Sequence, residues 1–446
     1  MAPSPSRAGP QRLGRRATIL AALCLLAFAV LAVAFARITV PAGPTPLPST
    51  RPTRGELHSA DGQVLAHGAL DARRYPLGSL AAPVIGFVGA SGGLEGTERA
   101  MNRRLQRGEA LTLTLDTRVQ AAVEAVLTEA VRRTDAQFAS AAVMDTRTGE
   151  LRAVVSVPGF DPGAWRQVPA DRWRNRAALD EYEPGSVVKA LTVAALLDEG
   201  RTTPDTVYDT PMWRRYAGAT INDLVSHPAR LTTRQILRYS SNVGMTRLVE
   251  GVPPELLYRY FTAYGFGQPV RLGLPAGDGL LRDPEDWSAL SQATLSFGQG
   301  LTVTTLQLVA AFNVLANDGQ YVPPRLFPGD VAGARQVLRR ETATRMREVL
   351  REVIDDGIRG KAELPGYHVG GKTGTAQVAV DGRYSGKVFS STFAGFLPAA
   401  QPRFTVVVMV RGAKREYQGS QLAVPIFRDI SAALLSLYSY TPDEQR

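Results

Sequence analysis

Glu183-Pro184-Gly185-Ser186-Val187-Val188-Lys189 is the stretch that says most about the fold and chemistry of this chain. Its Pro-Gly pair marks a turn, and the apolar run from Val187 to Leu197 has helical spacing. Residues three apart share one face of a helix, so the Ser186 hydroxyl and the Lys189 amine are predicted to meet. A serine becomes a nucleophile when a base takes its proton, and a lysine with a depressed pKa can be that base.

Lysine is rare here: the chain has 446 residues and 51 Lys+Arg, of which only five are lysine. In an average protein an S-x-x-K pattern is usually a capping serine beside a solvated lysine. In this chain a second lysine, Lys372, also lies in a short polar motif, Lys372-Thr373-Gly374-Thr375, ahead of a predicted strand. Arginine could not serve as the base, because it does not lose its proton in proteins.

Composition excludes several classes of function. The net charge of +10 comes from basic residues that are spread along the chain and interleaved with acids, so no nucleic-acid partner is predicted. Cys24 is the only cysteine, which excludes a disulfide framework and a cysteine-based zinc site. With four histidines and no H-E-x-x-H pattern, the chain is predicted to need neither metal nor cofactor.

Two further segments match known sequence motifs, but the elements that must flank those motifs are not predicted here. Residues 366–373 fit the phosphate-binding G-x-x-x-x-G-K-[ST] loop, but a strand-forming run follows where that loop requires a helix. Residues 89–93 fit the nucleophile elbow G-x-S-x-G, but a poor helix start follows and no later histidine is clearly placed. Residues 89–93 are interpreted as a glycine-rich loop, and no phosphate site is predicted at 366–373.

The N-terminal part predicts membrane attachment. Residues 17–37 begin with about 20 uncharged residues, enough to span a bilayer, and only basic charges precede them. We therefore predict a cytoplasmic tail (1–16), a transmembrane anchor (17–37), a Pro-rich spacer (38–53) and an exported remainder. A cleaved signal peptide is the alternative, because Ala34-Phe35-Ala36 resembles a cleavage site.

The exported part is predicted to hold two modules: a small, mainly β module over 54–135 and a larger one over 136–440. In the larger module, predicted strands are followed by predicted helices and then by strands and a closing helix, which favours an α+β fold with helices against an antiparallel sheet. The predicted helices are 187–197, 233–239, 304–316 and 424–437. The predicted strands are 141–145, 151–156, 375–380, 388–396 and 403–410.

Three motifs in one order give the chain a family resemblance. Ser186-x-x-Lys189, Ser240-x-Asn242 and Lys372-Thr373-Gly374 resemble the S-x-x-K, S-x-N and K-T-G set of penicillin-binding proteins and serine β-lactamases. Further stretches resemble class B penicillin-binding proteins in particular: 54–66, 93–99, 114–116, 160–162, 182–186 and 297–304. The N-terminal module would be that family's pedestal, shorter than usual at about 100 residues with its spacer.

The resemblance implies a role for each motif residue. Ser186 would be acylated by the penultimate D-Ala of a peptidoglycan stem peptide, with Lys189 as its base and Ser240 as a proton relay. Asn242 would hold the substrate backbone, and Lys372 would add positive potential. Thr373, Gly374 and Thr375 would bind the terminal carboxylate, and the N–H groups of Ser186 and Thr375 would form the oxyanion hole.

The resemblance also implies partners and leaves alternatives. Expected ligands are D-Ala-D-Ala stem peptides and β-lactam antibiotics, and expected partners are a membrane glycosyltransferase and division proteins. Residues 295–304 and 393–398 favour a septal, cell-division transpeptidase over the elongation type. The alternatives are the elongation type, a D,D-carboxypeptidase or β-lactamase on the same fold, and a non-catalytic division scaffold or β-lactam sensor.

Overall fold

The computed structural model describes Ile19 and residues 21–31, 54–329, 332–380 and 383–441. The chain divides into two units, Met1–Arg51 and Pro52–Arg446. In the first unit, Ile19 and residues 21–31 are helical and exposed, while the rest of the predicted tail, anchor and spacer lies outside the described residues. Among the residues that are described, no helix is both long and apolar enough to cross a membrane.

A five-stranded antiparallel sheet forms the centre of the second unit, as predicted. Its strand order is β12-β13-β14-β4-β5, so strands from the end of the chain pair with strands from the middle. The first strand of the larger module, β4, therefore pairs with the last one, β14, and β5 pairs with β4 at the edge of the sheet. The bounds are β4 (Phe138–Asp145), β5 (Leu151–Val157), β12 (Gly370–Val380), β13 (Arg383–Leu397) and β14 (Phe404–Arg411).

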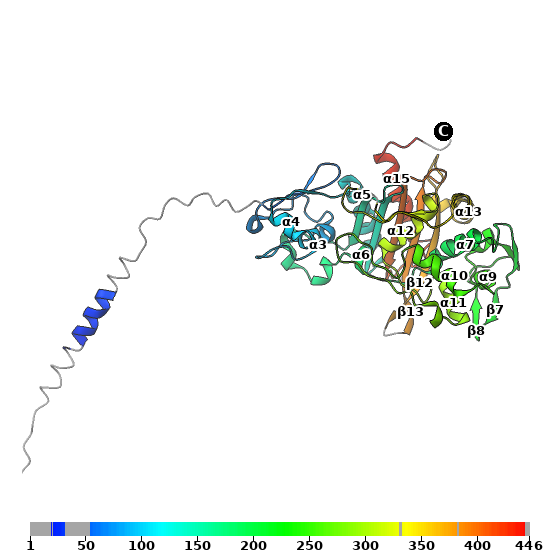
Figure 1. Ribbon diagram of the computed structural model, residues 1–446, viewed down its shortest axis with the longest axis horizontal. Helices are drawn as coiled ribbons and strands as arrows, with labels where there is room; N and C mark the ends of the chain where they lie inside the picture. Colours follow the sequence, from blue (N-terminus) through cyan, green and yellow to red (C-terminus); the bar gives the residue numbers. More distant parts are fainter. Residues whose placement is uncertain (1–18, 20, 32–53, 330–331, 381–382, 442–446) are drawn as a thin grey trace, which may run out of the picture. The chain divides into compact units, whose positions relative to one another are not determined.

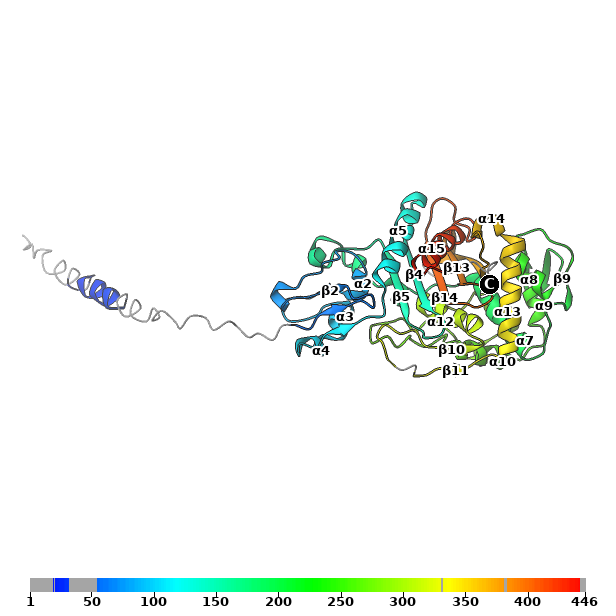
Figure 2. The ribbon, with the colours of Figure 1, turned by 90° about the horizontal axis from the view of Figure 1, so that it is seen from above.

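Both faces of this sheet are buried, because its strands are apolar at successive positions rather than at alternate ones. In β4, Ala141 and Val143 face one core and Ala142 and Met144 face the other. The first core is covered by α5 (Thr117–Thr134) and α15 (Ala423–Leu437). The second core is covered by α12 (Thr305–Ala316), on the opposite face of the sheet (Figures 1 and 2).

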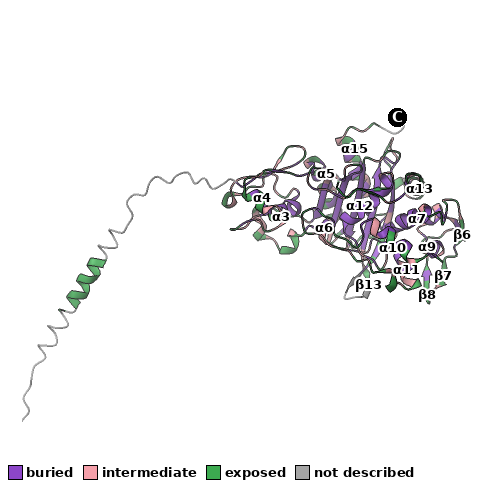
Figure 3. Cartoon of the chain, in the orientation of Figure 1, coloured by how far each residue is buried: buried purple, intermediate pink, exposed green. Residues whose placement is uncertain are grey.

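The helix that follows the nucleophile motif, α7 (Val188–Asp198), lies deep in the second core. All of its residues except Asp198 are buried, and Figure 3 shows it among the buried elements with α12. A helix that is apolar on every side belongs in an interior. Its burial also places Lys189 inside the protein.

The N-terminal module contains short elements. Its sheet joins β1 (Leu57–His58), β2 (Val64–Ala66) and β3 (Leu111–Thr112), and an Asp61-Gly62 turn lies between β1 and β2. Three helices accompany the strands: α2 (Ala82–Ile85), α3 (Gly96–Ala100) and α4 (Asn102–Gln106). Helix α5, which the predicted division assigns to this module, instead packs against β5 and α15 of the larger one. The apolar side chains of α5, among them Val119, Val123 and Leu127, are buried in the same core as Val143 and Val155 of the sheet.

The four predicted helices and five predicted strands of the larger module are confirmed to within a few residues, as α7, α8 (Thr233–Tyr239), α12, α15 and the sheet strands. Sequence reasoning missed the segment between α7 and α8. It forms two hairpin-like pairs, in which β6 (Val207–Asp209) pairs with β9 (Arg230–Thr232) and β7 (Trp213–Tyr216) with β8 (Ala219–Asn222). Further helices are η2 (Pro162–Gln167), η3 (Ala170–Trp173), α6 (Arg176–Leu179), α9 (Asn242–Leu248), α10 (Pro254–Ala263), η5 (Pro284–Asp286), α11 (Ala289–Ser296), α13 (Arg340–Gly357) and α14 (Arg359–Ala362).

Candidate active site

The nucleophile motif occupies a tight turn at the start of α7. The 3-10 turn η4 (Gly185–Val187) runs directly into the helix, and Gly185 has a φ of 57°, which favours glycine. Ser186 is half-buried and lines a cleft of about 610 Å³, whereas Lys189, one turn further on, is fully buried. The turn thus presents the hydroxyl to the cleft and keeps the amine beneath it.

Lys189 joins the first two motifs. Its Nζ donates to the backbone oxygen of Ser240 and, at 2.8 Å, to Oδ1 of Asn242, and it lies 3.3 Å from Oγ of Ser240. A neutral amine has two N–H groups and one lone pair. With the carbonyl and the amide oxygen as acceptors, the lone pair is left for a hydroxyl proton.

Ser240 lies between two lysines. Its Oγ is 3.1 Å from Nζ of Lys372 as well as 3.3 Å from Nζ of Lys189. Ser240 caps the C-terminus of α8 with a φ of 56°, a left-handed conformation that is uncommon for a residue other than glycine. This sharp end of α8 brings the hydroxyl between the amines, at the position that a proton relay requires.

Burial changes the ionisation of both lysines. It lowers the pKa of Lys189 well below the ordinary value, and the positive charge of Lys372 lowers it further, while the negative charge of Asp223 opposes the shift. Burial lowers the pKa of Lys372 to about 7. An amine with a pKa this low can be neutral near pH 7, and only a neutral amine can take a proton from serine.

The third motif lies on β12, the edge strand of the sheet. Gly374 packs so closely against the nucleophile turn that a Cβ there would lie 2.4 Å from the Pro184 oxygen. Oγ1 of Thr375 accepts from the Gly419 N–H at 2.9 Å, which leaves the hydroxyl hydrogen of Thr375 to donate to a ligand. An edge strand can also pair with an extended peptide through its own backbone groups.

The structure therefore brings the three motifs to one cleft. Ser186, Ser240, Asn242, Thr373 and Thr375 line it, Lys189 and Lys372 lie buried behind the Ser240 hydroxyl, and Gly374 packs against the turn. The phosphate-loop interpretation of residues 366–373 fails, as expected, because Lys372 and Thr373 lie on a strand. The other residues that line the cleft are Gly185, Leu224, Val225, Tyr239, Phe297, Gln299, Gln377, Phe389, Tyr417, Gln418 and Ser420.

Several of these lining residues were not found by sequence reasoning. Phe389 of β13 stacks on Tyr417, which follows β14, with ring centroids 4.4 Å apart, and the pair forms an aromatic wall of the cleft. Phe297 is 5.9 Å from Nζ of Lys189, measured to its ring centroid. In the sequence Phe389 and Tyr417 look like ordinary strand and loop residues, so no signal marked them, whereas Phe297 opens the family-like stretch 297–304.

The segment 298–303 also holds the nucleophile turn, through its own backbone. Gly185 donates its N–H to the Gly298 oxygen at 3.1 Å, and the Gly300 N–H donates to Oε1 of Glu183 at 2.8 Å. Tyr182 and Val303 exchange two backbone hydrogen bonds of 3.0 and 2.9 Å. The position of Ser186 therefore depends on two backbones that approach each other closely.

We expect Gly298→Ala to slow acylation of Ser186 by about 10- to 100-fold, because small displacements of reacting groups are costly. A Cβ at Gly298 would lie 2.0 Å from the Gly185 oxygen. Gly300→Ala is the matched control: the two φ values are 85° and 84°, but the nearest neighbour of a Cβ at Gly300 is 3.8 Å away. Equal rates for the two variants, measured with a fluorescent penicillin, would show that the contact with the turn is unimportant.

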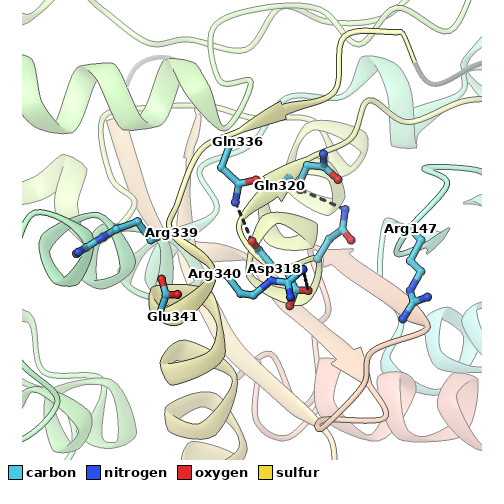
Figure 4. Close-up of a pocket in the computed structure, with 8 residues that line it drawn as sticks. Arg147, Asp318, Gln320, Gln336, Arg339, Arg340 and Glu341 are labelled. Atoms are coloured by element: carbon cyan, nitrogen blue, oxygen red, sulfur yellow. Dashed lines mark hydrogen bonds and ion pairs between the residues drawn. The ribbon is translucent and has the colours of Figure 1, made fainter.

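A second concavity, of about 670 Å³, lies near the start of α13 (Figure 4). Its lining is polar, and several lining residues bind one another. Nε2 of Gln336 donates to the backbone oxygen of Asp318 at 2.9 Å, and Arg340 forms an ion pair of 3.3 Å with the Asp318 carboxylate. No residue of the three motifs lines it. The cleft at Ser186 is therefore the candidate active site.

Comparison with known proteins agrees with this geometry. Residues 139–432 match the family described as penicillin binding protein transpeptidase domain. The chain is 35% identical over 341 residues to a probable peptidoglycan D,D-transpeptidase PenA of Neisseria flavescens, covering 76% of this chain and 85% of that protein. It is 33% identical over 407 residues to the peptidoglycan D,D-transpeptidase FtsI of Escherichia coli K12, covering 83% of this chain and 68% of that one.

Solved structures show the same fold. The crystal structure of penicillin binding protein 3 from Mycobacterium tuberculosis superposes with a TM-score of 0.82 at 31% identity, covering 87% of this chain and 97% of the other. The same protein has been solved in complex with aztreonam and with ampicillin, with the same TM-score.

Proposed function

The chain belongs to the class B penicillin-binding protein transpeptidases, and we propose that it cross-links peptidoglycan stem peptides through an acyl-enzyme on Ser186. One observation carries the proposal: the Ser240 hydroxyl lies within 3.3 Å of two buried lysine amines, beside the turn that presents Ser186. Few arrangements that lack a metal and a histidine can activate a serine. A pair of lysines with lowered pKa values is one of them.

The first half-reaction acylates the enzyme. Oγ of Ser186 attacks the carbonyl carbon of the penultimate D-Ala while Lys189 takes the hydroxyl proton. The amide C–N bond then breaks, and the leaving nitrogen receives a proton from Lys189 through Ser240, so that D-Ala departs as a neutral amine. Backbone N–H groups of Ser186 and Thr375 stabilise the oxyanion, and loss of one such donor typically costs about 3–4 kcal/mol.

The second half-reaction transfers the acyl group. The amine of a second stem peptide attacks the ester carbonyl, gives up a proton toward Lys189, and forms the new amide bond. The ester C–O bond breaks, and Ser186 recovers its proton. The enzyme returns to its starting state without a cofactor.

The remaining motif residues hold the substrate. Oδ1 of Asn242 accepts from Lys189 and its Nδ2 donates to the Asn222 oxygen at 3.2 Å, so the second hydrogen of Nδ2 is available for a substrate carbonyl. Thr373 and Thr375 bind the terminal carboxylate, Gly374 lets β12 approach the turn, and Lys372 supplies positive potential when it is protonated.

The lining of the cleft disfavours a hydrolase. A class A β-lactamase uses a glutamate and a positioned water to release its acyl-enzyme. Among the described residues that line the cleft there is neither Asp nor Glu. The intact lysine–serine geometry likewise disfavours a non-catalytic scaffold or sensor.

We further propose that the enzyme is a single-pass protein of the bacterial plasma membrane, with residues 17–37 as its anchor and its catalytic domain outside the cytoplasm. The apolar stretch and the arginines that precede it support this proposal. The similarity to FtsI supports a septal role, in which a membrane glycosyltransferase and division proteins would be the partners.

Labelling of the purified protein with a fluorescent penicillin tests the activity. A transpeptidase should form a covalent adduct that persists for hours, whereas an adduct lost within seconds would indicate a β-lactamase. Depletion from cells separates the two biological roles: a septal enzyme gives filaments and an elongation enzyme gives round cells. Absence of an adduct on folded protein would exclude the enzymatic proposal.

A further inference from the structure

A buried ionisable pair, His227 and Asp223, lies beside the S-x-N motif and has no part in the mechanism above. Both residues belong to the segment that follows β8, and their side chains are 0% and 2% exposed. His227 Nε2 and Asp223 Oδ2 are 2.8 Å apart. Charged side chains are seldom buried this deeply unless they are paired and serve a purpose.

Asp223 holds the S-x-N motif and the residue after it through three donors. Its Oδ1 accepts from the backbone N–H groups of Asn242, at 2.5 Å, and Val243, at 3.1 Å. Its Oδ2 accepts from the Ser241 hydroxyl at 2.5 Å and from His227. The start of α9 and the residue between Ser240 and Asn242 are therefore tied to one carboxylate.

Both ring nitrogens of His227 face oxygen atoms. Its Nδ1 lies 2.8 Å from the Pro228 carbonyl oxygen, which can only accept. Its Nε2 lies 2.8 Å from the Asp223 carboxylate oxygen that also accepts from the Ser241 hydroxyl. Two acceptors, one at each ring nitrogen, form the surroundings that suit an imidazolium.

The pair is coupled to the base. Lys189 donates to Asn242, whose backbone Asp223 holds. The negative charge of Asp223 also raises the pKa of Lys189, against the effects of burial and Lys372. An imidazolium on the other side of the carboxylate offsets that charge, which favours the neutral amine.

We propose that Asp223 and His227 are positioning residues that hold the S-x-N motif against Lys189 and, as an ion pair, keep Lys189 neutral to accept the Ser186 proton. This inference rests on the proposed transpeptidase function. The ring of His227 also faces that of Tyr239, with centroids 5.8 Å apart, and the Arg238 guanidinium lies 5.4 Å from the Tyr239 centroid. Toward Lys189, the charged neighbours are Lys372 and Asp223.

Two variants test the charge of the pair by the pH dependence of penicillin acylation. The rate should rise with pH as Lys189 becomes neutral. His227→Gln retains a donor for Asp223 but loses the positive charge, so the midpoint of the rise should move to higher pH by about one unit. Asp223→Asn removes the negative charge, so the midpoint should move to lower pH, with a reduced plateau because the motif is held less firmly.

The opposite directions of these shifts separate an electrostatic role from a structural one, which would lower the plateau and leave the midpoint in place. His368→Gln is the matched control, because it removes a partly exposed histidine that is 3.2 Å from Asp355, and its profile should be that of the natural chain. Unmoved midpoints, or shifts in the same direction, would overturn the proposal.

Nitrogen NMR of the unaltered protein gives a test that does not depend on folding of the variants. His227 should show hydrogens on both ring nitrogens at pH 7, and a hydrogen on only one would overturn the assignment of an imidazolium. If the natural chain is not acylated by penicillin, the proposed function fails, while the NMR result still decides the state of the pair.

Discussion

The Ser186→Ala variant should form no covalent adduct with a fluorescent penicillin, a loss of at least about 10⁴-fold in acylation rate. The alanine removes the oxygen that is expected to form the ester, whereas the cleft, the lysine amines and the edge strand stay in place. Since Ser186 is half-buried on a turn fixed by its backbone, we expect the variant to fold normally. Gel fluorescence with melting curves measures both properties.

Ser436→Ala is a suitable control for that experiment. Ser436 is an exposed serine on α15, which packs against the opposite face of the sheet from α7, and its loss should leave labelling unchanged. A persistent adduct on the Ser186→Ala protein would mean that another hydroxyl in the cleft is the nucleophile. Ser240 and Ser420 would then be the first positions to examine.

Much of the fold could be predicted because its signals are local. The helix after Ser186 and the strands around residues 375–410 have clear periodicity, and the Gly185 and Asp-Gly turns are marked by their residue types. The pairing of β14 with β4, by contrast, joins residues more than 250 positions apart, and only the α+β order of elements hinted at it. That the three motifs form one site was predicted from the family resemblance, because periodicity does not indicate which distant segments meet.

What sequence reasoning missed depends on tertiary contacts. Asp223 and His227 lie in a segment of weak periodicity, and nothing in their spacing reveals that they are buried against Asn242. The aromatic wall of Phe389 and Tyr417 comes from a strand and a loop that meet only in the fold. The low pKa of Lys189 has the same origin, because its main cause is burial in a core made by distant elements.

Lys189→Arg should slow acylation by about 10²- to 10⁴-fold, the range that general-base catalysis usually contributes. Arginine keeps donors for the Ser240 oxygen and Asn242, but it is permanently protonated, so it cannot take the Ser186 proton. Lys189→Met tests the same role without charge and with less added bulk. Both variants should be slow if the missing function is proton transfer.

The outcome for this pair of variants separates two explanations of the buried lysine. If Lys189 served only to place a positive charge near the oxyanion, Lys189→Arg would keep most of the rate and Lys189→Met would lose it. If Lys189 is the base, both variants lose most of the acylation rate. Raising the pH should restore neither rate, because no titrating amine remains at that position.

Lys414→Arg is the control: this exposed lysine is 2.8 Å from Asp135 on the surface, and the change should have no effect on the acylation rate. Near-normal acylation by Lys189→Arg would remove Lys189 as the base and transfer that role to Lys372, whose amine is the other one next to the Ser240 hydroxyl.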